Sequence, residues 1–197
     1  MDLEAELGAH PVMVIIRNET PERTVALCEA AWDLGVRVVE VPVQVPEAVP
    51  SLSAAVRAGE RRGIRVGAGS VHTLEQWDAA IDAGAAFTVA AATVPAVLAR
   101  AQERGITHVP GVATGTEVAA ALAAGATWLK AFPASVLTPA WVDAIRAPFP
   151  QASFVATGGV TADNARAFLD AGCRAVAFGS SFERPDTART IGELLAG

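Results

Sequence analysis

The stretch TVALCEAAWDLGVRVVEVPV, residues 24–43, contains one complete helix-to-strand unit. Thr24–Asp33 is an alanine-rich helical stretch, and Gly35 is the expected residue for the left-handed position that ends a helix. Val36–Val43 follows as a nearly continuous apolar run, which is typical of a parallel strand covered on both faces. The unit therefore predicts an α/β fold with a buried parallel sheet.

The same unit recurs along the whole chain. Further helical stretches lie at 73–83, 95–104, 116–124 and 162–171, and glycines again follow helices at Gly63, Gly84, Gly105, Gly125 and Gly172. The predicted strands are Val12–Arg17, Val36–Val43, Arg65–Gly69, Ala86–Ala90, Thr107–Pro110, Ala126–Lys130, Ser153–Ala156 and Ala175–Phe178. Eight units of about 20 to 30 residues predict a single-domain (β/α)8 TIM barrel over residues 1–197. An open doubly wound sheet is the alternative, but it normally carries a glycine-rich fingerprint after its first strand, where this chain reads Arg17–Thr20.

Composition excludes several classes of protein. At 52% hydrophobic and 18% charged residues, the chain can bury a large core and is not disordered. A net charge of −6 argues against binding to nucleic acid. The acidic N-terminus is not a signal peptide, and no apolar run is long enough to span a membrane, so we expect a cytoplasmic protein with no membrane partner. Cys28 and Cys173 are too few for a disulfide scaffold, and no cluster has metal-ligand spacing, so no metal is expected.

Polar residues collect where the predicted strands end. Arg17 ends the first strand, Glu40 lies near the end of the second, and Ser70 follows the third. Lys130 ends the sixth strand, and Thr157 follows the seventh. In a TIM barrel the carboxyl ends of the strands form the active site, so these side chains are expected to meet there.

Lys130 is the strongest candidate for a catalytic residue, because it is the only lysine of the chain and lies in an apolar segment beside Trp128 and Phe132. Lysine can lose its proton and attack a carbonyl to form a Schiff base, which arginine cannot do. Such chemistry needs a proton-transferring partner, and Glu40 is the candidate, since its strand is too apolar to carry a carboxylate without a role. The structural alternatives are a surface lysine at a strand end and a glutamate that only pairs with Arg17 or Arg37.

The loops after the last two predicted strands are candidates for binding phosphate. Gly158 and Gly159 precede a helix predicted to begin near Ala162, so backbone N–H groups and the helix dipole can favour an anion. Gly179, Ser180 and Ser181 supply more donors at the neighbouring strand, where TIM barrels commonly bind phosphate. The histidines are weaker candidates: His72 lies near the mouth of the barrel, His108 within a strand, and His10 near an end expected to be disordered.

Taken together, these segments resemble the 2-keto-3-deoxy-6-phosphogluconate (KDPG) aldolases and the related 2-keto-3-deoxy-6-phosphogalactonate aldolases. The resemblance covers nearly the whole chain and rests on the stretches at 39–41, 67–71, 110–114, 129–134, 157–160 and 179–181. It implies a class I aldolase, a metal-independent lyase without a cofactor, that forms homotrimers. Lys130 would be the Schiff-base lysine and Glu40 the general acid/base. The substrate-binding positions would be Arg17, Gln44, Ser70, Phe132 and Thr157, with phosphate at Gly158, Gly159, Gly179, Ser180 and Ser181.

The chain departs from the gluconate-type pattern at the expected carboxylate clamp. Gln44 stands where that family usually has an arginine, which is closer to the galactonate type and leaves Arg17 as the best candidate for the carboxylate. Thr157, in contrast, is more like the gluconate type. The leading hypothesis is cleavage of a 2-keto-3-deoxy-6-phospho sugar acid to pyruvate and glyceraldehyde 3-phosphate. The alternatives are a pyruvate-dependent aldolase for another 2-keto acid, such as 4-hydroxy-2-oxoglutarate, and a non-catalytic barrel that binds a phosphorylated metabolite.

Overall fold

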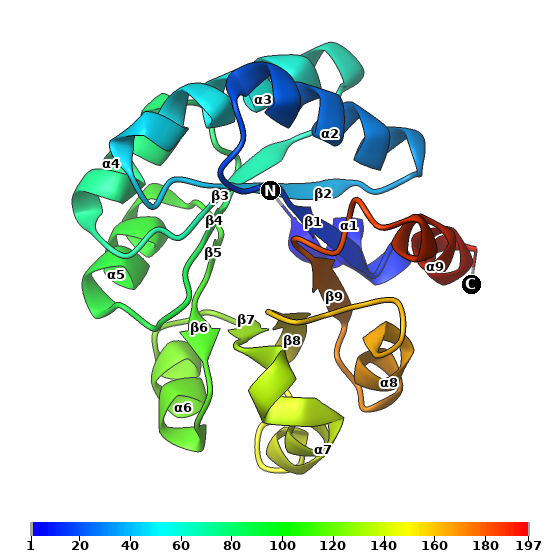
Figure 1. The fold of residues 1–197 in the computed structure, drawn as a ribbon. Coiled ribbons are helices and arrows are strands. Elements are labelled where there is room, and N and C mark those ends of the chain that lie inside the picture. Colours follow the sequence, from blue (N-terminus) through cyan, green and yellow to red (C-terminus); the bar gives the residue numbers. More distant parts are fainter. Residues whose placement is uncertain (1, 197) are drawn as a thin grey trace.

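The strands of the structure, a computed structural model that describes residues 2–196, form one parallel sheet surrounded by helices (Figure 1). The strands are β1 (Val12–Ile15), β2 (Val38–Pro42), β3 (Val66–Gly69), β4 (Thr88–Val89), β5 (His108–Val109), β6 (Gly111–Val112), β7 (Trp128–Ala131), β8 (Ser153–Thr157) and β9 (Ala175–Phe178). The helices are α1 (Leu3–Ala9), α2 (Pro21–Asp33), the 3-10 turn η1 (Pro46–Ala48), α3 (Val49–Arg62), α4 (Leu74–Asp82), α5 (Pro95–Arg104), α6 (Gly115–Ala123), α7 (Ala134–Arg146), α8 (Ala165–Asp170) and α9 (Pro185–Leu195).

The sheet closes on itself through a strand that is divided at Pro110. Its order is β5-β4-β3-β2-β1-β9-β8-β7-β6, so β5 and β6, which are consecutive in the chain, stand at the two ends of the order. Pro110 has no N–H group to donate, but its carbonyl accepts a hydrogen bond from the Lys130 N–H at 2.9 Å. The predicted (β/α)8 barrel is therefore confirmed, with β5 and β6 as the two halves of its fifth strand.

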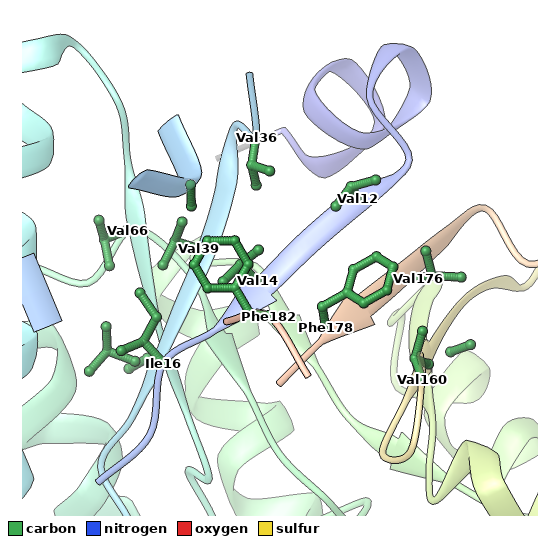
Figure 2. Packing of buried hydrophobic residues seen from close by; sticks show 14 of the residues in the cluster. Val12, Val14, Ile16, Val36, Val39, Val66, Val160, Val176, Phe178 and Phe182 are labelled. Carbon is green, nitrogen blue, oxygen red and sulfur yellow. The ribbon is translucent and has the colours of Figure 1, made fainter. Parts of the chain in front are cut away.

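The residues of each strand alternate between two apolar layers. On β1, Val12 and Val14 face the helices, whereas Met13 and Ile15 belong to the cluster inside the barrel. Figure 2 shows Val12 and Val14 in the outer layer, near Phe178 of β9. Because both faces of every strand are covered, the strands are mostly apolar, as the sequence predicted, and buried charged residues such as Glu40 on β2 and Lys130 on β7 are exceptions.

The N-terminal segment differs from expectation. Residues 3–9 form α1, whose first turn is capped by the Asp2 carboxylate, which accepts hydrogen bonds from two backbone N–H groups. Leu3 and Leu7 are 3% and 1% exposed and pack into the inner cluster, so α1 closes the end of the barrel where β1 begins. His10, which was predicted to lie near a disordered end, instead follows this ordered helix as its C-terminal cap.

The ends of the other helices largely follow the sequence. The glycines predicted to follow helices have φ angles between +62° and +98°, values that an L side chain rarely adopts. The helix predicted to begin near Ala162 starts only at Ala165, after a turn. Within residues 2–196, no helix is both long enough and apolar enough to cross a bilayer.

Candidate active site

A cavity of about 730 Å³ opens at the carboxyl ends of the strands. It is lined by every predicted site residue except Glu40, namely Arg17, Gln44, Ser70, Lys130, Phe132, Thr157, Gly158, Gly159, Gly179, Ser180 and Ser181. The structure thus brings together residues from the ends of strands far apart in the chain, as the parallel barrel requires.

Lys130 and Glu40 form a buried pair in the barrel interior, where Lys130 lines this cavity and Glu40 lies beside Lys130 without lining it. Lys130 lies on β7 and is 3% exposed, and Glu40 lies on β2 and is 0% exposed. The distance from Lys130 Nζ to Glu40 Oε1 is 3.8 Å. That distance is too long for a hydrogen bond, and neither carboxylate oxygen of Glu40 has another partner within the described residues. Unpaired buried oxygens are costly, so a bound molecule that donates a hydrogen bond to this carboxylate would be favoured.

The structure does not support the two structural alternatives for this pair. Lys130 is buried and not at the surface, and its Nζ lies 5.3 Å from the centroid of the Phe132 ring. Arg37 is one of the two proposed partners of Glu40, but its Nε lies 3.8 Å from Glu6 Oε2 instead. The other, Arg17, makes hydrogen bonds to uncharged side chains.

Gly69 provides the space that Glu40 occupies. The two residues lie on neighbouring strands, and a Cβ atom at Gly69 would overlap the Glu40 carboxylate. Sequence reasoning recorded Gly69 as part of a motif but gave it no role. Its lack of a side chain is what allows the carboxylate to point toward Lys130.

Arg17 is held at the mouth of the cavity by a chain of side-chain hydrogen bonds. Its Nη1 donates to Ser70 Oγ at 3.2 Å and to Gln44 Oε1 at 3.4 Å, and Gln44 Nε2 donates to Asn18 Oδ1 at 2.6 Å. Since a guanidinium only donates, Gln44 must present its oxygen to Arg17 and its amide nitrogen to Asn18. Gln44 therefore orients Arg17, and Asn18, which the sequence did not single out, orients Gln44.

His72 also lines the cavity, and its Nε2 accepts a hydrogen bond from the Ala91 N–H at 3.0 Å. Burial lowers the pKa of His72, and the charges of Lys130 and Arg17 lower it further. A hydrogen bond with the Ser70 backbone partly offsets this by raising the pKa. A neutral imidazole can accept the hydrogen bond from the Ala91 N–H, and this bond anchors the loop after β4. His108 lies outside the cavity, with Nδ1 2.8 Å from Thr88 Oγ1, as expected for a structural histidine.

The loops after β8 and β9 meet at the other end of the cavity. Gly158 and Gly159 have φ angles of +88° and +82°, and a Cβ atom on either would crowd Phe132 or Ser135. Ser181 Oγ donates to the Val160 carbonyl at 2.8 Å and joins the two loops. The helix dipole expected behind the glycines is not there, because a turn held by Asn164 separates them from α8. Any anion here would be bound by loop donors.

The cavity is cationic in an acidic chain. Arg17, Lys130 and Arg184 line it, whereas none of its lining residues in the described part of the chain is an aspartate or a glutamate. Arg184 was missed by sequence reasoning, because nothing in the residue order sets it apart from the other arginines. Within residues 2–196, no group of three or more His, Cys, Asp or Glu side chains could hold a metal ion. Cations at both ends of the cavity suit a ligand with two anionic groups.

Comparison with known proteins agrees with this geometry. A family model described as KDPG and KHG aldolase matches residues 3–190. The 2-dehydro-3-deoxy-6-phosphogalactonate aldolase of Escherichia coli K12 is 38% identical over 175 residues, which cover 88% of this chain and 85% of that protein. The 2-dehydro-3-deoxy-phosphogluconate aldolase of Treponema pallidum is 33% identical over 184 residues, which cover 93% of this chain and 86% of that protein.

A solved structure adds evidence for the chemistry of these relatives. It is a KDPG aldolase from Legionella pneumophila with pyruvate captured as a covalent carbinolamine intermediate. The match covers 100% of this chain and 98% of the Legionella chain. The TM-score is 0.86 at 28% sequence identity. The family match spans nearly the whole barrel, and the chain belongs to the KDPG and KHG aldolase family of class I, Schiff-base aldolases.

Proposed function

We propose that the protein cleaves a 2-keto-3-deoxy-6-phospho sugar acid, of the gluconate or galactonate type, to pyruvate and glyceraldehyde 3-phosphate. The observation that carries the proposal is the buried Lys130–Glu40 pair, in which the lysine lines a cationic cavity and the carboxylate oxygens have no hydrogen-bond partner within the described residues. A lone amine and a free carboxylate at 3.8 Å are a nucleophile and a proton carrier within reach of one substrate carbon chain.

The reaction follows from these two groups. Lys130 attacks the C2 carbonyl as the free amine, and the carbinolamine takes up one proton from water and loses water to give an iminium ion; the final hydrolysis releases that proton again. Glu40 then accepts the proton of the C4 hydroxyl, directly or through water, while the C3–C4 bond breaks and its electrons move into the iminium to form an enamine. The aldehyde leaves, Glu40 returns a proton to C3, and water hydrolyses the imine to release pyruvate and restore Lys130.

The remaining residues are assigned by their place in the cavity. Arg17 is proposed to bind the carboxylate of the keto acid, with Gln44 and Ser70 holding its guanidinium in place. Phe132 and Thr157 line the wall beside Lys130. The backbone and hydroxyl groups of Gly158, Gly159, Gly179, Ser180 and Ser181 are proposed to bind the phosphate.

The second candidate function is cleavage of an unphosphorylated 2-keto acid such as 4-hydroxy-2-oxoglutarate. It is favoured by Gln44, which contacts Arg17 and does not add a cation of its own at the carboxylate end. A purely binding barrel is disfavoured, because it has no use for a buried amine beside an unpaired carboxylate.

The experiment is to compare kcat/KM for the gluconate and galactonate phosphates with that for 4-hydroxy-2-oxoglutarate, measuring pyruvate with a coupled dehydrogenase. A preference of at least about tenfold for a phosphorylated substrate, or 1.4 kcal/mol of transition-state binding, is expected. A smaller preference would favour the second candidate, and absence of turnover on all three would contradict both. The same assay decides which configuration at C4 is preferred.

The resemblance to the KDPG aldolases also leads us to propose a cytoplasmic homotrimer. Sedimentation equilibrium tests the assembly, since a trimer has three times the 20.2 kDa mass of the chain. A single species at the mass of one chain or two would contradict it.

A further inference from the structure

We propose that Arg184 binds the phosphate of the substrate and sets the preference for phosphorylated substrates; this rests on the proposed function. Arg184 lines the cavity together with Ser180 and Ser181. Its backbone N–H donates to the Ser181 carbonyl at 3.1 Å, so the turn after β9 returns the residue to the side of the proposed phosphate donors. Of the three cations that line the cavity, Arg17 is hydrogen-bonded to Gln44 and Ser70, and Lys130 is paired with Glu40. Arg184, in contrast, follows the loop that carries Ser180 and Ser181 and is paired with the partly exposed Asp186.

The present partner of Arg184 is one that a phosphate can replace. Its Nε and Nη2 each lie 3.3 Å from an oxygen of Asp186, longer than a strong charged hydrogen bond. The two side chains are 62% and 36% exposed, so water screens their attraction. A phosphate group carries up to two charges and three acceptor oxygens, and a guanidinium can bind two of those oxygens at once.

The surrounding charges allow this exchange. The carboxylate next in sequence, Glu183, is paired with Arg23 and does not compete for Arg184. Asp186 keeps a second role when Arg184 leaves, because its Oδ1 also accepts a hydrogen bond from the Thr187 N–H at 3.1 Å in the first turn of α9. Movement of the Arg184 side chain therefore leaves Asp186 with a hydrogen-bond partner.

The test compares Arg184→Gln with two matched variants, Asp186→Asn and Arg189→Gln. Asp186→Asn breaks the same ion pair from the other side, and Arg189→Gln removes an arginine of α9 that is 75% exposed and outside the cavity. For Arg184→Gln we expect kcat/KM to fall about tenfold to a hundredfold on the phosphorylated sugar acid, chiefly through KM, and to stay within about twofold on the unphosphorylated one. Both control variants should keep the phosphate preference of the parent.

Two results would overturn the proposal. One is a phosphate preference in Arg184→Gln that stays within about twofold of the parent. The other is an equal loss in Asp186→Asn, which would mean that the ion pair acts on α9 and not on the substrate.

A second readout separates this proposal from the proposed function. Thermal unfolding is measured in inorganic phosphate and in chloride of equal ionic strength, because an anion that binds the folded state raises Tm. The parent should gain stability in phosphate and Arg184→Gln should not. If the parent has no aldolase turnover but shows this difference, the proposed function fails while Arg184 remains an anion-binding residue. Equal gains in parent and variant would contradict the role of Arg184.

Discussion

The two ends of the cavity are built in different ways. At the keto-acid end, Lys130 and Glu40 project from strands, are almost fully buried, and have neighbours that leave them little freedom. At the end proposed to bind phosphate, the proposed donors are loop residues and Arg184, whose side chain is mostly exposed. A strand fixes a reacting atom more precisely than a loop, whereas a loop can adjust to a diffuse charge. We therefore expect changes at the first end to act on kcat and changes at the second to act on KM.

Of the substitutions considered, Lys130→Arg should lower kcat the most. Arginine keeps the positive charge beside Glu40 but cannot form an imine, so kcat should fall by at least about 10⁴-fold. Steady-state kinetics measures the loss, and circular dichroism checks that the barrel still folds. Turnover within about tenfold of the parent would remove Lys130 from the mechanism.

Glu40→Gln separates imine formation from bond cleavage. Glutamine nearly preserves the shape of the side chain but cannot carry the proton, so kcat for cleavage should fall about 10²- to 10⁴-fold. The imine with pyruvate should still form, because Lys130 is unchanged. Equal loss of imine formation and cleavage would mean that Glu40 acts only by positioning Lys130.

Gly69→Ala tests whether the Glu40 carboxylate has room to move beside Lys130. The added methyl group would overlap the Glu40 carboxylate, so we expect kcat to fall about tenfold to a hundredfold and stability to fall by about 1–3 kcal/mol. Gly192→Ala is the matched control, because a Cβ atom there meets nothing within 4 Å, and it should leave kcat unchanged. A Gly69→Ala variant with the kinetics of the parent would show that the carboxylate has room to move.

His108→Gln should give the smallest effect on activity, since the residue lies at neither end of the cavity. Burial, with a smaller contribution from the charge of His72, lowers the pKa of His108 from 6.5 to about 4. The unfolded chain therefore binds a proton that the folded protein does not, and this part of the stability is lost as the pH falls from 6.5 to 4. The difference amounts to roughly 3 kcal/mol at pH 4.

Urea unfolding at pH 7 and at pH 4.5 measures this effect. The parent should lose about 2–3 kcal/mol more than His108→Gln between these two pH values. Activity of the variant at pH 7 should stay within about twofold of the parent. An equal pH dependence in the two proteins would contradict the assignment of His108 as a buried neutral histidine.

The same contrast explains what the sequence could predict. Continuous apolar runs and glycines at helix ends are local signals, and they identified the barrel. A single lysine and a glutamate in apolar strands are conspicuous because burying a charge is costly, and the structure pairs the two in the barrel interior.

The loop residues were less predictable. Asn18 and Ser70 adopt φ angles of +62° and +58°, which their residue types do not reveal, and these conformations belong to the loops around Arg17. Arg184 comes to the cavity only because the turn after β9 folds back. The start of α8 was misplaced, because Thr161–Asn164 forms a side-chain-stabilised turn where a helix was expected.

Reduction with sodium borohydride in the presence of pyruvate tests whether Lys130 forms a Schiff base with pyruvate. Peptide mass spectrometry should then find one reduced pyruvyl adduct, on the peptide that contains Lys130, in the parent and in Glu40→Gln but not in Lys130→Arg. A folded parent that gives no adduct at saturating pyruvate, or an adduct that persists in Lys130→Arg, would contradict the account.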